Sequence, residues 1–80
     1  MLSEPQAHRL LDDLCIKLGF CLPPADQSKL KRDPPRNVGA FTDAVFLAEG
    51  LDVELVDRHL YRQVRDMVAA AFARSGYDGA

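Results

Sequence analysis

Cysteine and histidine are the residue types in this chain best suited to metal or redox chemistry. Cys15 and Cys21 lie six positions apart, and His8 and His59 are the two histidines. A structural zinc site needs four ligands at recognisable spacings, and these residues form no such pattern. The close Cys-X-X-Cys spacing of redox pairs is also missing. We therefore expect no metal and no cofactor. In a cytosolic chain two free thiols packed as small hydrophobes are favoured over a disulfide, although the sequence leaves their redox state open.

Candidates for catalysis are equally sparse. An enzyme needs a nucleophile, an acid-base pair or a metal cluster that converges on a cavity. Ser3 and Ser75 occupy capping or terminal positions, and His59 lies in a long helical pattern among charged neighbours, as an ordinary surface histidine does. The five glycines are scattered and form no phosphate-binding loop. The sequence thus indicates no catalytic residue, and we interpret the chain as not an enzyme.

One stretch invites comparison with carrier proteins. Asp26-Gln27-Ser28-Lys29-Leu30 resembles the Asp-Ser-Leu setting of acyl carrier proteins, in which a serine at the start of a helix is modified. Here a glutamine is inserted before the serine and a lysine follows it, so the motif is lost. A carrier protein or a small enzyme is therefore the least favoured function.

Helical periodicity organises most of the chain. Ser3 and Asp52 suit N-cap positions, and Gly19 and Gly50 suit helix ends. The strict alternation typical of strands is absent. We expect one domain over residues 1–80, with an all-α fold: a small irregular bundle of three main helices plus one short helix. The predicted helices are at about 4–18, 24–32, 38–49 and 53–74, with a frayed tail at 77–80.

The apolar stripes of these helices predict the core. Four large residues lie centrally on their stripes and should be nearly inaccessible to solvent: Leu14, Phe46, Leu60 and Phe72. Three adjacent large residues cannot share one narrow stripe, so the third helix should be buried on much of its circumference. These three are Val45, Phe46 and Leu47.

Charge and hydropathy restrict the partners. The formal net charge is −2 at pH 7, with ten basic and twelve acidic residues, whereas nucleic-acid binders usually carry a basic face. Residues 41–68 resemble a degenerate helix-turn-helix, but its second helix would open with Asp52, Glu54 and Asp57, which would repel DNA. A DNA-associated regulator is the second choice, and nucleic acid is disfavoured as a partner. No stretch approaches membrane-spanning length, so we expect no membrane contact and a cytoplasmic protein.

Recognition of another protein is the function that remains. The chain has the general size and charge of small bacterial inhibitors, immunity proteins and antitoxins, and a homodimer is compatible with it. Prolines restrict the 20–24 loop, and arginines offer planar donors to an acidic partner. The predicted partner surface comprises Phe20, Leu22, Pro23, Arg58, Arg62 and Arg65. In the alternative reading, Phe20 and Leu22 close the bundle beneath the first helix, and the arginines are a solvated face paired with Asp57 and Asp66.

Overall fold

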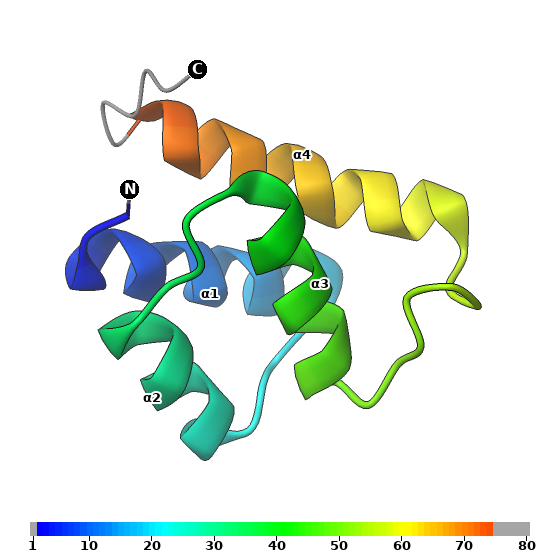
Figure 1. The fold of residues 1–80 in the computed structure, drawn as a ribbon, viewed down its shortest axis with the longest axis horizontal. Coiled ribbons are helices and arrows are strands. Elements are labelled where there is room, and N and C mark those ends of the chain that lie inside the picture. Colours follow the sequence, from blue (N-terminus) through cyan, green and yellow to red (C-terminus); the bar gives the residue numbers. More distant parts are fainter. Residues whose placement is uncertain (1, 75–80) are drawn as a thin grey trace.

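A computed structural model describes residues 2–74 of the chain. These residues form an all-α bundle of four helices with no strand among them (Figure 1). The helix α1 contacts both α2 and α4, and α3 runs across α4. The predicted fold class is confirmed, and the predicted tail at 77–80 lies outside the described residues. The four helices are α1 (Glu4–Leu18), α2 (Pro24–Arg32), α3 (Val38–Ala48) and α4 (Arg58–Arg74).

The first helix follows its local signals. Ser3 caps its N-terminus, and its side chain and that of Gln6 form a reciprocal capping box. Gly19 ends the helix in the left-handed region at φ 76°, where a residue with a side chain would be strained. The Phe20 N–H then donates to the Leu14 carbonyl at 3.1 Å, which turns the chain back toward α1.

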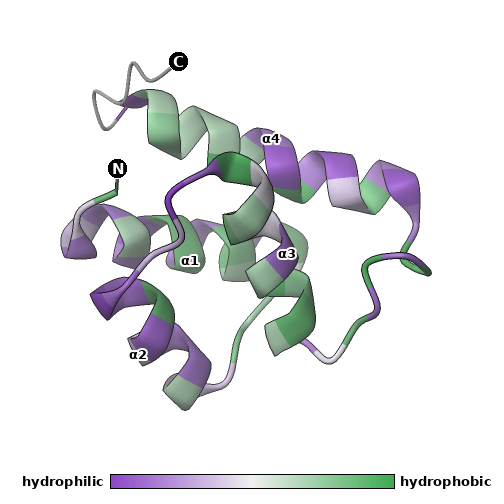
Figure 2. Cartoon of the chain, viewed as in Figure 1, coloured by the Kyte–Doolittle hydropathy of each residue, from purple (hydrophilic) through white to green (hydrophobic). Residues whose placement is uncertain are grey.

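The second helix is short and mostly polar. Pro24 lies in its first turn, and Leu30 is its one buried residue. It ends at Asp33, directly before Pro34, because a residue that precedes proline disfavours helical geometry. Figure 2 shows that hydrophilic residues dominate α2 and also the first half of α4.

The third helix supplies the centre of the core. The Asn37 side chain accepts a hydrogen bond from the Ala40 N–H at 2.7 Å and so caps the helix. Val45 and Phe46 are fully buried, but Leu47 is 65% exposed. The expectation that α3 is buried on much of its circumference is therefore wrong at Leu47, which borders a surface hollow between α2 and α3.

The last helix begins at Arg58, five residues later than predicted. The side chain of Asp57 accepts from the Leu60 N–H at 3.3 Å, and its carbonyl accepts from the Tyr61 N–H at 2.9 Å. Asp57 therefore acts as the cap, and Asp52 does not start the helix. The later start of α4 changes one of the predicted core positions. Leu14, Phe46 and Phe72 are buried as predicted, whereas Leu60 is only partly buried. Because α4 begins at Arg58, Leu60 lies in its first turn, near the end of the apolar stripe.

Hydropathy gives no membrane-spanning helix in the described part of the chain.

Candidate binding pocket

A surface pocket of about 410 Å³ lies between the α3–α4 connection and the first half of α4. The connection, residues 49–57, leads from α3 into the start of α4 (Figure 1). Three of its residues, Val53, Glu54 and Val56, line one side of the pocket. The pocket combines basic, aromatic and aliphatic groups. Its lining residues are Val53, Glu54, Val56, Arg58, Tyr61, Arg62 and Arg65. We call this feature the arginine pocket.

Helical spacing explains why α4 contributes one basic face. Arg58, Tyr61, Arg62 and Arg65 occupy positions i, i+3, i+4 and i+7. Residues at these spacings are neighbours on a helix surface. The side chains thus lie together on one side of α4, next to the stripe that packs into the core, and Tyr61 lies at the border between the two. This places all three predicted arginines in one site.

The other wall is shaped by backbone hydrogen bonds. The Asp52 side chain accepts from the Glu54 N–H at 2.9 Å, and the Asp52 carbonyl accepts from the Val56 N–H at 3.0 Å. These bonds close a single turn before Asp57 starts α4. Val53 and Val56 pack partly against the core, and Leu55, between them, is 82% exposed. The connection is therefore ordered although it is no helix.

Tyr61 attaches the pocket to the core. Its ring stacks on Phe46, with centroids 5.3 Å apart and planes 18° from parallel. Its hydroxyl donates to Asp43 Oδ1 at 2.8 Å, which joins α4 to α3. The hydrogen bond to Asp43 raises the pKa of Tyr61, and burial and the Asp43 charge raise it further, while nearby Arg65 lowers it. The floor of the pocket is thus fixed by contacts on two elements.

The arginines have no carboxylate partner in the described part of the chain. The ion pair seen there joins His8 and Asp12 at 3.2 Å, and no acidic oxygen of residues 2–74 lies within 4.0 Å of the three guanidinium groups. The pairing with Asp57 and Asp66 that the alternative reading expects is therefore not formed, whereas all three arginines are exposed, as in a solvated face. Of the described lining residues Glu54 alone is acidic, so three arginines against one glutamate leave a local charge of +2.

The loop residues of the predicted partner surface, Phe20, Leu22 and Pro23, do not line the arginine pocket. Phe20 and Leu22 are buried, at 7% and 4% exposure, and only Pro23 is exposed. The Phe20 ring meets Phe46 edge to face at 5.2 Å. The loop therefore closes the bundle, and the structure does not place these residues in the arginine pocket. Their size and apolar character favoured core as much as contact, and core is what they form.

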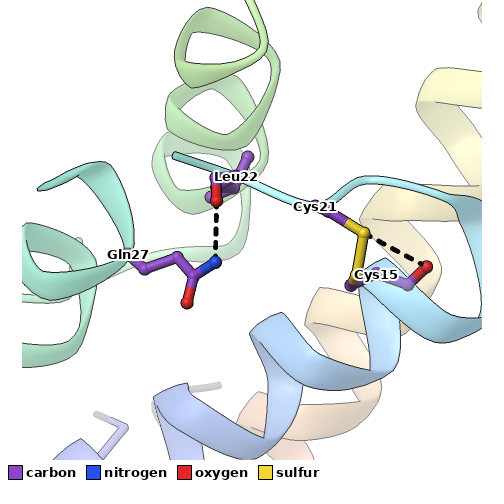
Figure 3. Close-up of a disulfide and its surroundings, with 4 residues drawn as sticks. All are labelled: Cys15, Cys21, Leu22 and Gln27. Carbon is purple, nitrogen blue, oxygen red and sulfur yellow. Dashed lines mark hydrogen bonds between the residues drawn. A yellow bond between two sulfur atoms is a disulfide. The ribbon is translucent and has the colours of Figure 1, made fainter. Parts of the chain in front are cut away.

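The cysteines are also not as predicted. Cys15 and Cys21 form a disulfide, so the expectation of two free thiols is wrong (Figure 3). The turn at Gly19 brings residue 21 back to the last turn of α1, and the two Cα atoms are 4.3 Å apart. Gln27 secures the far side of the same loop, since its Nε2 donates to the Leu22 carbonyl at 2.7 Å. In residues 2–74 no cluster of potential metal ligands is found.

Sequence reasoning found the arginines but missed the opposite wall. Val53, Glu54 and Val56 fall inside the helix that the sequence predicts at 53–74, so the pattern gives no sign that they form a separate wall facing α4. The available signal was the pair of aspartates at 52 and 57, since each can cap a turn. Two caps five residues apart indicate a break between them.

Comparisons with known proteins do not indicate what the arginine pocket binds. No protein family model matches the chain, and no curated protein or solved structure shows significant similarity to it. What the pocket binds must follow from its own chemistry.

Proposed function

We propose that this chain is a non-catalytic protein-binding module and that the arginine pocket is its contact site for the partner. The observation that carries the proposal is the group formed by Arg58, Arg62 and Arg65, which share one concave site and have no acidic partner among residues 2–74. Arginine in such a site offers planar, paired donors to a carboxylate. Of the roles that suit a small partner-binding chain, a bacterial inhibitor, immunity or antitoxin-type protein is the one we propose.

Rigidity supports this proposal. The arginines project from the longest helix, and Tyr61 fixes that helix to α3 through its ring and its hydroxyl. The backbone that carries the site is ordered before binding, so the entropy cost falls on the arginine side chains and not on the helix. A pocket that carries apolar walls and a few charged groups is also typical of a recognition site.

The DNA-associated alternative is less well supported. A helix-turn-helix needs a tight turn of about three or four residues, whereas α3 and α4 are separated by residues 49–57. Asp52, Glu54 and Asp57 all lie at the entrance of α4 and would face neighbouring phosphates. A second copy of the chain would bring the same net negative charge to the pocket, so a homodimer remains one outcome of the test.

The disulfide bears on the compartment. Disulfides persist in oxidising environments and are rare in the cytosol. The pair Cys15–Cys21 therefore favours an oxidising compartment over the cytoplasm that the sequence led us to expect. Thiol labelling of protein isolated from its source, before and after reduction, distinguishes the two: label taken up without reduction would favour the cytoplasm.

Affinity capture from the source organism, followed by reconstitution with the purified partner, tests the proposal. The double variant Arg62→Glu with Arg65→Glu should fold and should lose most of its binding to that partner. Arg32→Glu with Arg36→Glu is the matched control, because both residues are exposed, lie outside the pocket and give the same change in net charge. The control should bind as the parent does.

Two results would contradict the proposal. Equal binding by the parent and by a folded pocket variant would remove the pocket from the interface. Retention of nucleic acid in place of a protein, in a manner sensitive to salt, would favour the DNA-associated alternative.

A further inference from the structure

This inference rests on the proposed function and names the chemistry of the partner at the same site. We infer that the arginine pocket accepts a single carboxylate side chain flanked by aliphatic residues, presented by a short acidic segment of another protein.

The basic face explains the carboxylate. Arg58 and Arg62 are one helical turn apart, and Arg65 follows on the same face. A guanidinium group binds a carboxylate through two parallel hydrogen bonds, which fixes its position as well as its charge. Clusters of arginines are a recurring means of holding acidic motifs. The lining residues carry a formal charge of +2, which Asp52 and Asp57 beside the pocket partly offset, so an anionic group is attracted at the guanidinium groups themselves.

The opposite wall explains the aliphatic neighbours. Val53 and Val56 border the pocket, and the Tyr61 ring forms part of its surface. These groups offer no charge and one hydroxyl, and that hydroxyl already donates to Asp43. Side chains on either side of the bound carboxylate would therefore gain by covering apolar surface. At about 410 Å³ the pocket lies near the small end of the usual range for ligand sites, which suits a few side chains of a peptide.

The surrounding charges disfavour phosphate and nucleic acid. Glu54 is on the wall, and Asp52 and Asp57 are exposed beside it. Attraction to the arginines grows in proportion to the ligand charge, but the cost of removing that charge from water grows with its square. A dianionic phosphate therefore loses more than a carboxylate in a partly apolar pocket. A polyanion would also bring neighbouring phosphates against the three acidic residues.

Peptide titration of isotope-labelled protein, followed by NMR, tests this inference. The probe is a capped peptide with the core Leu-Glu-Leu between short Gly-Ser arms. It should shift the amide signals of residues 53–65, and its affinity should fall as salt is raised. Replacement of the glutamate by glutamine should weaken binding by about tenfold or more, because charge-assisted hydrogen bonds are lost. Replacement of both leucines by serine should weaken it by about threefold or more.

Protein variants complete the test. Arg62→Glu with Arg65→Glu should abolish the shifts, and Arg32→Glu with Arg36→Glu should leave them unchanged. If the pocket double variant is poorly folded, Arg62→Gln provides a milder change. Glu54→Gln should strengthen binding of the glutamate peptide by about two- to fivefold, because one repulsive charge is removed.

Several results would overturn the inference. These are equal binding of the glutamine peptide, tighter binding of a Leu-phosphoserine-Leu peptide or of duplex DNA, and shifts confined to residues outside 53–65. Absence of any shift with the glutamate peptide would also overturn it. If the captured partner still required Arg62 and Arg65 in that case, the proposed function would stand and only the carboxylate chemistry would be wrong.

Discussion

The connections at residues 19–23 and 49–57 each contain a left-handed glycine, Gly19 and Gly50, yet they are attached to the bundle differently. The first is held by its side chains: Phe20 and Leu22 are buried, and the disulfide joins the loop to α1. The second is shaped by local backbone hydrogen bonds to Asp52 and Asp57, and its side chains Val53 and Val56 are only partly buried against the core.

The mode of attachment decides which connection can contact a partner. Side chains that anchor a loop in the core are no longer available at the surface. Where capping carboxylates shape the backbone, the side chains between the caps need not be fully buried, so exposed Glu54 and partly buried Val53 both line the pocket. In this bundle the 19–23 connection stabilises the fold, and the 49–57 connection shapes the candidate site.

Truncation of the first connection should have the largest effect. Phe20→Ala removes a buried ring that meets Phe46 edge to face. We expect a loss of about 3 to 5 kcal/mol in the free energy of unfolding, from lost burial and from the cavity left behind. Chemical denaturation followed by circular dichroism measures it. A loss below about 1 kcal/mol would mean that this loop does not anchor the bundle.

Removal of the disulfide should have the next largest effect. The pair Cys15→Ser and Cys21→Ser opens a loop of residues 15–21, and the chain-entropy relation gives a loss of roughly 2 kcal/mol. Thermal melting of the variant, and of the parent with and without reductant, measures it. The reduced parent should melt close to the variant. Identical melting of the oxidised and reduced parent would show that the bond contributes nothing.

Tyr61→Phe tests the attachment of the pocket to the core. It keeps the ring on Phe46 but removes the hydrogen bond to Asp43, at a cost of about 1 kcal/mol near neutral pH. Because the folded pKa of Tyr61 lies above its usual value near 10, the neutral phenol stabilises the fold. That contribution is present below pH 10 and is lost as pH rises through the folded pKa. The difference between parent and variant should therefore shrink in alkaline denaturation series, and a constant difference would contradict this.

Leu55→Ala should have the smallest effect. This side chain is 82% exposed in the second connection, so we expect a change within about 0.5 kcal/mol. Denaturation under the conditions used for Phe20→Ala gives a direct comparison of the two connections. A loss similar to that of Phe20→Ala would show that Leu55 is packed against the bundle, contrary to its 82% exposure.

Local signals predicted much of this fold. The caps at Ser3 and Asn37 and the glycine at 19 set helix ends within a turn of the chain, where nearby backbone groups decide the outcome. The three arginines could be placed together because helical spacing fixes their common face. Positions that depend on distant contacts could not be predicted in this way.

The errors have two physical origins. Whether Phe20 is buried depends on where Phe46 lies, and whether Cys15 meets Cys21 depends on how far the chain reverses at Gly19. The start of α4 depends on a competition between two aspartates that both suit a cap. The first two are decided by three-dimensional proximity, which residue spacing specifies only within one helix. The third is local, and the two aspartates were its signal.

The position of Tyr61 couples occupancy of the pocket to the unfolding equilibrium. One face of its ring rests on Phe46 and another part borders the pocket, so a partner bound there also holds α4 against α3. By mass action, a ligand at a hundredfold excess over its Kd would add about 2.7 kcal/mol to the free energy of unfolding. For a chain of this size that is a substantial share of the whole, so the cellular lifetime of the protein would report how much of its partner is present.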